Sequence, residues 1–194
     1  MAAGFAEWQR EIEGSTQVER VEELLVLLPA NPDVLELGVG VGVRSTRLLA
    51  ERGRLTGVDL SAEQLRRARE QVPSASSVHG DVMEVDLEPG SFDAVVAAYV
   101  LNHLRPAELP PLARKVVGWL RPGGYFLASF GTTDNPGWTG EWLGVEMFFA
   151  GVRPEKNRRL IEDAGLALLR DEIEVLTEPE GEARFQWLLA RKPE

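Results

Sequence analysis

The sequence contains no cysteine, only two histidines, and fewer basic than acidic residues. Without cysteine the chain forms no disulfide, builds no thiolate metal site and has no thiol nucleophile, which fits a cytoplasmic, reducing environment. Its 21 Lys and Arg stand against 31 Asp and Glu, a formal net charge of -10, so we expect nucleic acid to be repelled. No cluster of potential ligands indicates a metal site.

The chain also lacks a signal peptide, a long apolar run, an internal repeat and a low-complexity segment. We therefore expect neither secretion nor a membrane span. Its 194 residues are enough for one well-buried domain and few for two. A hydrophobic share of 44% and a charged share of 27% are those of an ordinary globular protein.

An apolar strand pattern at residues 34–37 leads into glycines at every second position, Gly38, Gly40 and Gly42. Glycine accepts a positive φ and lets a ligand lie against the main chain, here at the carboxyl end of a buried strand. Residues 44–50 resume helical periodicity, so the free amides of that helix would point at the ligand. The pattern predicts a site for an adenosine-type ligand.

The spacing of these glycines separates two cofactor classes. Dinucleotide binders use G-x-G-x-x-G, and Val43 stands where that pattern needs its third glycine. Glu36 places a carboxylate at the end of the strand, where it would repel a pyrophosphate and attract a cation. The combination favours a cofactor with a positive charge near the loop.

Residues 34–49 resemble motif I of the class I S-adenosylmethionine-dependent methyltransferases, whose usual form is E/D-x-G-x-G-x-G. Further segments resemble later motifs of that family in the same order: a second strand with a terminal acid, the motif Gly80-Asp81-Val82, a fourth strand and a turn into the fifth, at residues 55–60, 80–82, 91–98 and 120–126. The resemblance implies an α/β fold, a Rossmann-like three-layer αβα sandwich. Its seven-stranded sheet is mostly parallel and has an antiparallel C-terminal strand pair.

We expect a single domain over residues 1–194. Its parts are N-terminal helices (1–33), a cofactor-binding core (34–130), a candidate substrate cap (131–153), and a last helix with edge strands (154–194). Periodicity and capping residues predict helices over 18–28, 61–71, 106–119 and 154–164, and strands over 166–175 and 184–191. Phe5 and Trp8 indicate one more short helix, which the resemblance places over the cofactor.

The resemblance assigns residues to S-adenosylmethionine. Asp59 would accept hydrogen bonds from the ribose hydroxyls, although it can instead begin the turn into the next helix. Asp81 and the Val82 amide would meet adenine, unless Asp81 is a solvated loop acid. Glu36 would lie near the methionine portion, held by the ammonium group or by a loop amide. The whole predicted set is Glu36, Gly38, Gly40, Gly42, Asp59, Leu60, Asp81, Val82, Ala97, Ala98 and Tyr99.

Methyl transfer requires an in-line nucleophile at near-attack distance and a route for its proton. His103 is the candidate general base, because a neutral imidazole can accept a proton at neutral pH. Its alternative role is to pack or to hydrogen-bond a neighbouring loop. The candidate substrate-binding residues are Asn102, Trp138, Trp142 and Phe148, although aromatic side chains of this kind can equally form core.

We expect a small-molecule acceptor, with an oxygen, nitrogen or carbon atom or a protein side chain left open. Residues 97–100 lack the prolines that enzymes methylating adenine bases or glutamine carry after the fourth strand. Methylation at C5 of cytosine requires a cysteine nucleophile, which the chain lacks. Two other functions remain: a non-catalytic sensor or partner subunit that binds S-adenosylmethionine or S-adenosylhomocysteine, and an NAD-dependent oxidoreductase, which Val43 disfavours.

Overall fold

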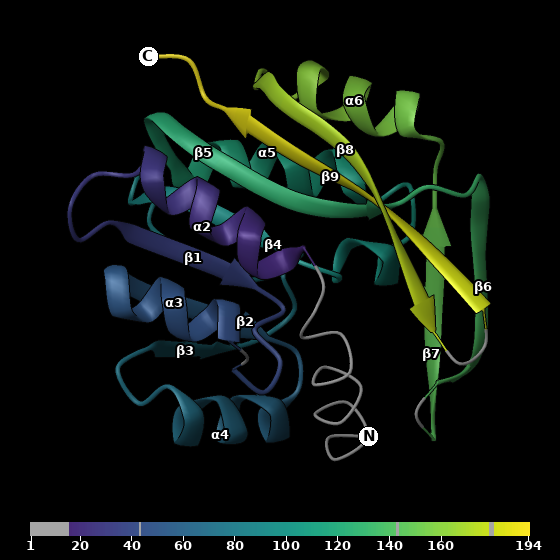
Figure 1. Ribbon diagram of the computed structural model, residues 1–194, viewed down its shortest axis with the longest axis horizontal. Coiled ribbons are helices and arrows are strands. Elements are labelled where there is room, and N and C mark those ends of the chain that lie inside the picture. The colour runs from purple at the N-terminus through teal and green to yellow at the C-terminus, as the bar shows by residue number, and fades with distance from the viewer. Residues whose placement is uncertain (1–15, 43, 143, 179–180) are drawn as a thin grey trace.

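The computed structural model describes residues 16–42, 44–142, 144–178 and 181–194. Its main sheet has seven strands in the order β3-β2-β1-β4-β5-β9-β8 (Figure 1). The strands are β1 (Asp33–Leu37), β2 (Arg54–Asp59), β3 (Ser76–His79), β4 (Phe92–Ala97), β5 (Leu120–Gly131), β8 (Ala167–Glu178) and β9 (Gly181–Arg191). Strands β1 to β5 pair in parallel, and β9 is antiparallel to both β5 and β8. The predicted fold class is confirmed.

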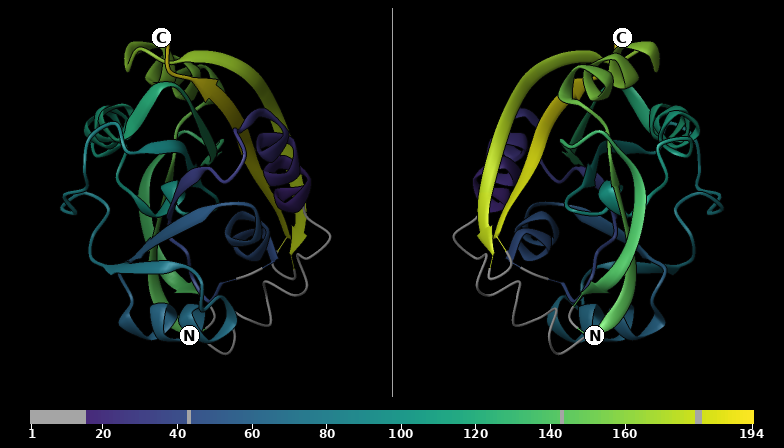
Figure 2. Two further views of the ribbon diagram at one scale, coloured as in Figure 1. Left: turned by 90° about the vertical axis from the view of Figure 1, so that its left-hand side faces the viewer. Right: turned by 90° about the vertical axis from the view of Figure 1, so that its right-hand side faces the viewer.

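Helices cover both faces of this sheet (Figures 1 and 2). They are α2 (Gln17–Leu27), α3 (Arg44–Arg52), α4 (Ala62–Gln71), α5 (Leu109–Trp119) and α6 (Pro154–Asp163), with a short 3-10 turn, η2 (Leu101–His103), after β4. Side chains of α2 and α3 share one core with the sheet, and those of α5 and α6 share the core of the other face. The structure is therefore a three-layer sandwich.

The central strands contribute to both cores, which explains their nearly continuous apolar sequences. In β1, Val34 packs with the α2 and α3 layer, while Leu35 and Leu37 pack with the α5 and α6 layer. Helix α2 buries Val21 and Leu24, spaced as neighbours on one helical face, against the first of these cores. This packing fixes the carboxyl ends of β1, β2 and β4 along one edge of the sheet.

Several predicted boundaries differ from the structure. The helix predicted from Pro106 begins at Leu109, because Pro110 and Pro111 occupy its first turn, where an amide hydrogen is not needed. The two C-terminal strands are longer than predicted and form one hairpin. The helix predicted around Phe5 and Trp8 lies outside the described residues.

The candidate cap contains two strands that the sequence did not predict. Strands β6 (Asn135–Trp142) and β7 (Val145–Gly151) pair with each other in a separate two-stranded antiparallel sheet. This hairpin follows β5 and contacts it (Figure 1). It also contacts η2, so the cap packs next to the turn that follows β4.

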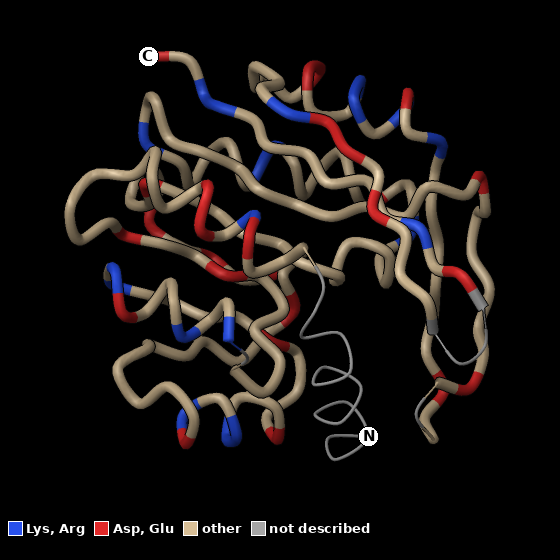
Figure 3. Tube along the Cα trace, in the orientation of Figure 1, with Lys and Arg blue, Asp and Glu red and all other residues tan. Residues whose placement is uncertain are grey.

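Both signs of charge occur on α4 and α6 (Figure 3). None of the helices in the described part of the chain is long and apolar enough to cross a bilayer.

Candidate functional site

The glycine loop after β1 has a backbone that other residues adopt with strain. Gly38, Gly40 and Gly42 have φ values of +70°, +56° and +76°. The amide of Gly38 donates to the Val58 carbonyl at 2.8 Å, which holds the start of the loop against β2. A Cβ added to Gly38 would lie 2.7 Å from Cγ2 of Val100. Backbone conformation and close packing therefore both call for glycine at position 38.

Asp59, at the end of β2, connects this loop to the next helix. Its Oδ2 accepts a hydrogen bond from the Gly40 amide at 2.9 Å, and its Oδ1 accepts one from the Ser61 amide at 2.8 Å. Burial raises the pKa of Asp59. A carboxylate oxygen can accept more than one hydrogen bond, so both oxygens retain capacity for a ligand. Asp59 thus has the predicted turn role, and its geometry leaves room for the predicted ribose contacts.

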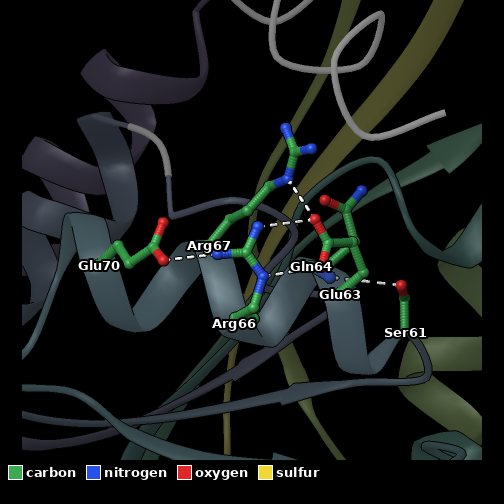
Figure 4. A network of polar contacts seen from close by, with 6 residues as sticks. All are labelled: Ser61, Glu63, Gln64, Arg66, Arg67 and Glu70. Carbon is green, nitrogen blue, oxygen red and sulfur yellow. Dashed lines mark hydrogen bonds and ion pairs between the residues drawn. The ribbon is translucent and has the colours of Figure 1, made fainter.

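Helix α4 begins directly after this turn and is fixed at its first residues (Figure 4). The Oγ of Ser61 accepts the Gln64 amide as an N-cap. Glu63 accepts hydrogen bonds from Arg66 and Arg67, which hold the pKa of its carboxyl at about 2. These local contacts set where the turn at Leu60 lies. The Leu60 side chain is 71% exposed and offers an apolar surface beside Asp59.

Glu36 is buried at the end of β1 with one oxygen unused. Its Oε1 accepts a hydrogen bond from Oγ1 of Thr46, on α3, at 3.1 Å, whereas its Oε2 has no hydrogen-bond partner among the described residues. Burial, with a smaller effect of the nearby Asp59 charge, raises the pKa of Glu36 to about 8. An unpaired carboxyl oxygen in this setting is a site for a cationic or hydrogen-bond-donating group.

Asp81 and Val82 lie on the turn that follows β3. Oδ1 of Asp81 accepts the Met83 amide at 2.8 Å, so this acid begins a turn while its other oxygen stays available. Nearby, Nε2 of His79 lies 3.0 Å from the Leu60 carbonyl and joins the ends of β2 and β3. The ends of β1, β2 and β3 therefore lie side by side with the predicted cofactor residues on them.

At the end of β4, Ala97 is buried and Tyr99 adopts a left-handed φ of +53°. The Tyr99 amide donates to Oγ of Ser129 at 2.6 Å, and its hydroxyl donates to Oε2 of Glu174 at 2.6 Å. Its ring meets those of Phe185 and Trp187 edge to face. The Tyr99 side chain is thus held toward β8 and β9. Sequence reasoning missed Glu174, Ser129 and Thr46, which are polar residues buried by distant parts of the chain.

His103 lies between the cap and the turn after β4. Its Nδ1 is 2.9 Å from the Phe148 carbonyl, its Nε2 is 3.4 Å from Nδ2 of Asn102, and burial lowers the pKa of the ring. Its ring centroid is 4.9 Å from that of Phe149. Asn102 is 9% exposed, and its Oδ1 has no partner among the described residues.

The pairing of β6 with β7 distributes the aromatic side chains of the cap. Trp138 faces Phe149 across the hairpin, with stacked rings 5.0 Å apart, and Trp142 meets the edge of Phe149 at 6.2 Å. Phe148 pairs with Thr139, so its side chain lies on the opposite face of the hairpin. The structure brings Trp138 and Trp142 together and separates Phe148 from them. Their role as substrate contacts stays a prediction.

Among the described residues, no group of three or more His, Asp or Glu side chains could hold a metal ion.

Comparison with protein families gives one domain match. A family model described as a methyltransferase domain matches residues 34–124. An uncharacterized methyltransferase of Mycobacterium tuberculosis is 32% identical over 150 residues, which cover 76% of this chain. The match covers 60% of that relative's own length. Trans-aconitate 2-methyltransferase of Rhodopseudomonas palustris is 33% identical over 131 residues, covering 62% of this chain and 48% of the relative.

A solved structure reproduces the fold over nearly the whole chain. It is 1,6-didemethyltoxoflavin-N1-methyltransferase of Burkholderia thailandensis, with 1,6-didemethyltoxoflavin and S-adenosylhomocysteine bound. The TM-score is 0.73 at 21% identity, and the similarity covers 98% of this chain and 84% of the other. At this identity the likeness establishes the fold.

Proposed function

Because this chain belongs to the class I S-adenosylmethionine-dependent methyltransferases, we propose that it transfers a methyl group from S-adenosylmethionine to a small-molecule acceptor. The single observation that carries the proposal is the unpartnered Oε2 of Glu36, buried at the carboxyl end of β1. It lies next to a loop whose three glycines all have a positive φ. A buried carboxyl beside bare backbone suits an adenosine cofactor that also carries an ammonium group.

In this proposal the residues at the carboxyl ends of the strands each contact a different part of the cofactor. When bound, S-adenosylmethionine supplies a methyl group on a sulfonium, which is already electrophilic. Glu36 pairs with the cofactor's ammonium group, and Asp59 accepts hydrogen bonds from its ribose hydroxyls. Leu60 packs against the adenine ring, while Asp81 and the Val82 amide contact its polar edge. The main chain of Ala97, Ala98 and Tyr99 borders the methionine portion.

Catalysis in this scheme rests on positioning the acceptor in line with the methyl group. The residues proposed to do so are Asn102 on η2 with Trp138, Trp142 and Phe148 on the cap. The role of His103 as a general base stays a prediction. Its contacts favour a positioning role, because Nδ1 faces the Phe148 carbonyl and Nε2 faces Asn102. Small-molecule acceptors are supported by relatives named for trans-aconitate and for 1,6-didemethyltoxoflavin.

Calorimetry with S-adenosylmethionine, S-adenosylhomocysteine and NAD tests the cofactor assignment. We expect both adenosylated sulfur compounds to bind and NAD to show no measurable heat of binding. Turnover of labelled S-adenosylmethionine across a panel of small metabolites then tests the transfer step. Binding without any methylated product would contradict an enzymatic role and favour the non-catalytic sensor. Tight binding of NAD would contradict the whole proposal.

A further inference from the structure

Hydrogen bonding between His103 and the cap fixes where the ring proton lies. The Phe148 carbonyl can only accept a hydrogen bond, so Nδ1 of His103, 2.9 Å away, must carry the hydrogen. Burial lowers the pKa of this histidine, so the ring is neutral at neutral pH. In a neutral imidazole with a protonated Nδ1, the other nitrogen has a free lone pair. Nε2 of His103 is therefore a hydrogen-bond acceptor.

The acceptor nitrogen in turn fixes the orientation of the Asn102 amide. The group that lies 3.4 Å from Nε2 of His103 must be the NH2 end of the Asn102 amide. The amide oxygen has no hydrogen to donate, so in this position its lone pairs would repel the lone pair of Nε2. The oxygen left over, Oδ1, is buried and has no partner in the described part of the chain. Folded proteins rarely leave such a group unpaired, since doing so costs about 1–3 kcal/mol. This oxygen is suited to a ligand that donates a hydrogen.

The surroundings of Asn102 indicate the shape of that ligand. Turn η2 follows the end of β4 and packs against β7, whose Phe149 ring lies beside His103. Phe149 belongs to the cap face that also carries Trp138 and Trp142. Aromatic faces of this kind favour planar aromatic partners. The unpaired oxygen of Asn102 and the aromatic face of the cap therefore belong to neighbouring segments.

We propose that Oδ1 of Asn102 accepts a hydrogen bond from the amino group of a planar aromatic amine, and that the nitrogen of this group is the methyl acceptor. This inference rests on the proposed function and names its substrate class. An amide oxygen can orient an N–H group but is too weak a base to remove its proton. A neutral amine still has a lone pair for attack.

The proton balance explains why the acceptor atom is nitrogen. As the lone pair forms the new carbon–nitrogen bond, the bond between the methyl carbon and sulfur breaks and its electron pair stays on sulfur. The methylated ammonium then releases its proton to water. A hydroxyl group would have to lose its proton during attack, and both ring nitrogens of His103 are already engaged. The site as built therefore suits an amine.

The test measures binding rather than turnover, in protein saturated with S-adenosylhomocysteine. Each amine is titrated beside the methyl compound of the same shape: aniline with toluene, and 3-aminoquinoline with 3-methylquinoline. Phenol and 3-hydroxyquinoline are titrated as the corresponding hydroxyl compounds. We expect at least one amine to bind about tenfold more tightly than its methyl counterpart, the scale of one hydrogen bond to a buried acceptor. In a separate turnover assay with S-adenosylmethionine as the methyl donor, we expect that amine, and not the phenols, to be methylated.

Two substitutions at Asn102 separate its oxygen from mere packing. Asn102→Leu should abolish the preference for the amine, and Asn102→Gln, which keeps both the NH2 and the oxygen of the amide, should retain part of it. Asn157→Ala is the matched control, because Asn157 also has a buried Oδ1 without a partner among the described residues, but it lies on α6. This control should keep the preference even if it loses stability. Circular dichroism establishes that each variant is folded.

Several outcomes would overturn the inference. These are equal binding of amines and methyl compounds, failure of every amine to bind, or an amine preference that persists in Asn102→Leu. Hydroxyl compounds that are methylated as fast as the amines would overturn the choice of nitrogen. NMR of the histidine nitrogens showing the hydrogen on Nε2 would overturn the orientation of the amide. If S-adenosylhomocysteine itself does not bind, the proposed function fails, and the same ligand pairs titrated into the free protein still test the amine preference.

Discussion

The hydroxyl of Tyr99 donates a 2.6 Å hydrogen bond to Oε2 of Glu174 and so links the end of β4 to the edge strand β8. The same buried carboxylate accepts hydrogen bonds from Nε1 of Trp187, on β9, and from the amide and hydroxyl of Thr16, at the start of α2. One acid therefore joins three segments that are distant in sequence. The end of β4 is thereby tied to β8, β9 and the start of α2 through a single buried side chain.

Glu174→Gln is expected to lower the free energy of unfolding by about 1–3 kcal/mol, because the new NH2 group cannot accept a hydrogen bond and leaves one donor unpaired. Tyr99→Phe should cost less, since it removes one partner of an acceptor that keeps others. The costs should not add in the double variant, because the two groups interact directly. Urea denaturation of the two single variants and the double variant measures these values.

Glu182→Gln is the control for that series. Glu182 lies on the neighbouring strand β9, and both its side chain and that of its partner Arg184 are exposed, so little stability should be lost. Strictly additive costs for Glu174→Gln and Tyr99→Phe would contradict a direct coupling.

Residues near Glu174 also show where sequence patterns fail. The alternation Glu172-Ile173-Glu174-Val175 suggests acids facing water and apolar residues facing inward. In the structure Glu174 is 5% exposed, whereas Ile173 and Val175 are 50% and 49% exposed. The partners that bury this acid come from α2, β4 and β9, which no local pattern contains. The fourth-strand motif likewise gave no sign that the Tyr99 side chain turns toward β8.

The glycine loop and the cap represent the two extremes of what the sequence could predict. Around Gly38 the pattern is dictated by positive backbone φ, so it can be predicted from local sequence. In the cap, Trp138 and Trp142 on β6 lie on the same face of the hairpin as Phe149 on β7. Frequent glycines and partly exposed side chains obscure this strand pattern in the sequence. The hairpin was therefore missed, although its aromatic residues were singled out.

Gly38→Ala is expected to destabilise the protein more than an ordinary glycine replacement. Its φ of +70° disfavours alanine, and the added Cβ would lie 2.7 Å from Val100. Gly90→Ala is the matched control, because Gly90 has a φ of +61° but no described atom within 4 Å of where its Cβ would lie, so only the backbone cost of about 1–2 kcal/mol applies. Thermal and urea unfolding compare the two variants.

Val100→Ala should relieve part of the cost of Gly38→Ala, because it removes Cγ2, at 2.7 Å from the added atom, and keeps Cβ, at 2.9 Å. Partial recovery toward the level of Gly90→Ala would assign the excess to the Val100 contact. Equal destabilisation by Gly38→Ala and Gly90→Ala, with no effect of Val100→Ala on the difference, would contradict a packing role for this glycine.

Asp59→Asn is expected to weaken binding of S-adenosylmethionine by about tenfold or more, because one carboxylate oxygen becomes a donor and the ribose loses an acceptor. The variant should also be less stable without ligand, since the Asp59 carboxylate accepts hydrogen bonds from the amides of Gly40 and Ser61. Calorimetry and unfolding experiments measure the two effects separately.

Asp33→Asn provides the comparison for that variant. Asp33 also accepts several hydrogen bonds, from Arg54 and Arg121, but it begins β1, at the opposite end of that strand from the glycine loop. It should lose stability and keep its affinity for the cofactor. If Asp59→Asn also keeps its affinity, the ribose assignment is wrong.

The buried Glu36 predicts an unusual dependence of stability on pH. Its pKa is about 8 in the folded chain, against a usual value of 4.5, so between these values the unfolded chain loses a proton that the folded chain retains. This contribution to stability is complete at low pH and is lost as pH rises toward about 8. Urea denaturation of the cofactor-free protein should show the decline, at most about 1.4 kcal/mol per pH unit. In Glu36→Gln, which cannot ionise, the decline should be absent.

Cofactor binding should reverse this preference for the protonated acid. If the ammonium group of S-adenosylmethionine meets Oε2 of Glu36, it favours the carboxylate, and binding at about pH 6.5 must release a proton. Calorimetry in two buffers with different ionisation enthalpies measures that release directly. Glu36→Gln should bind more weakly and release none, whereas the surface variant Glu182→Gln should behave like the parent protein. Binding without proton release in the parent would place the ammonium group away from Glu36 and leave the buried oxygen without its proposed partner.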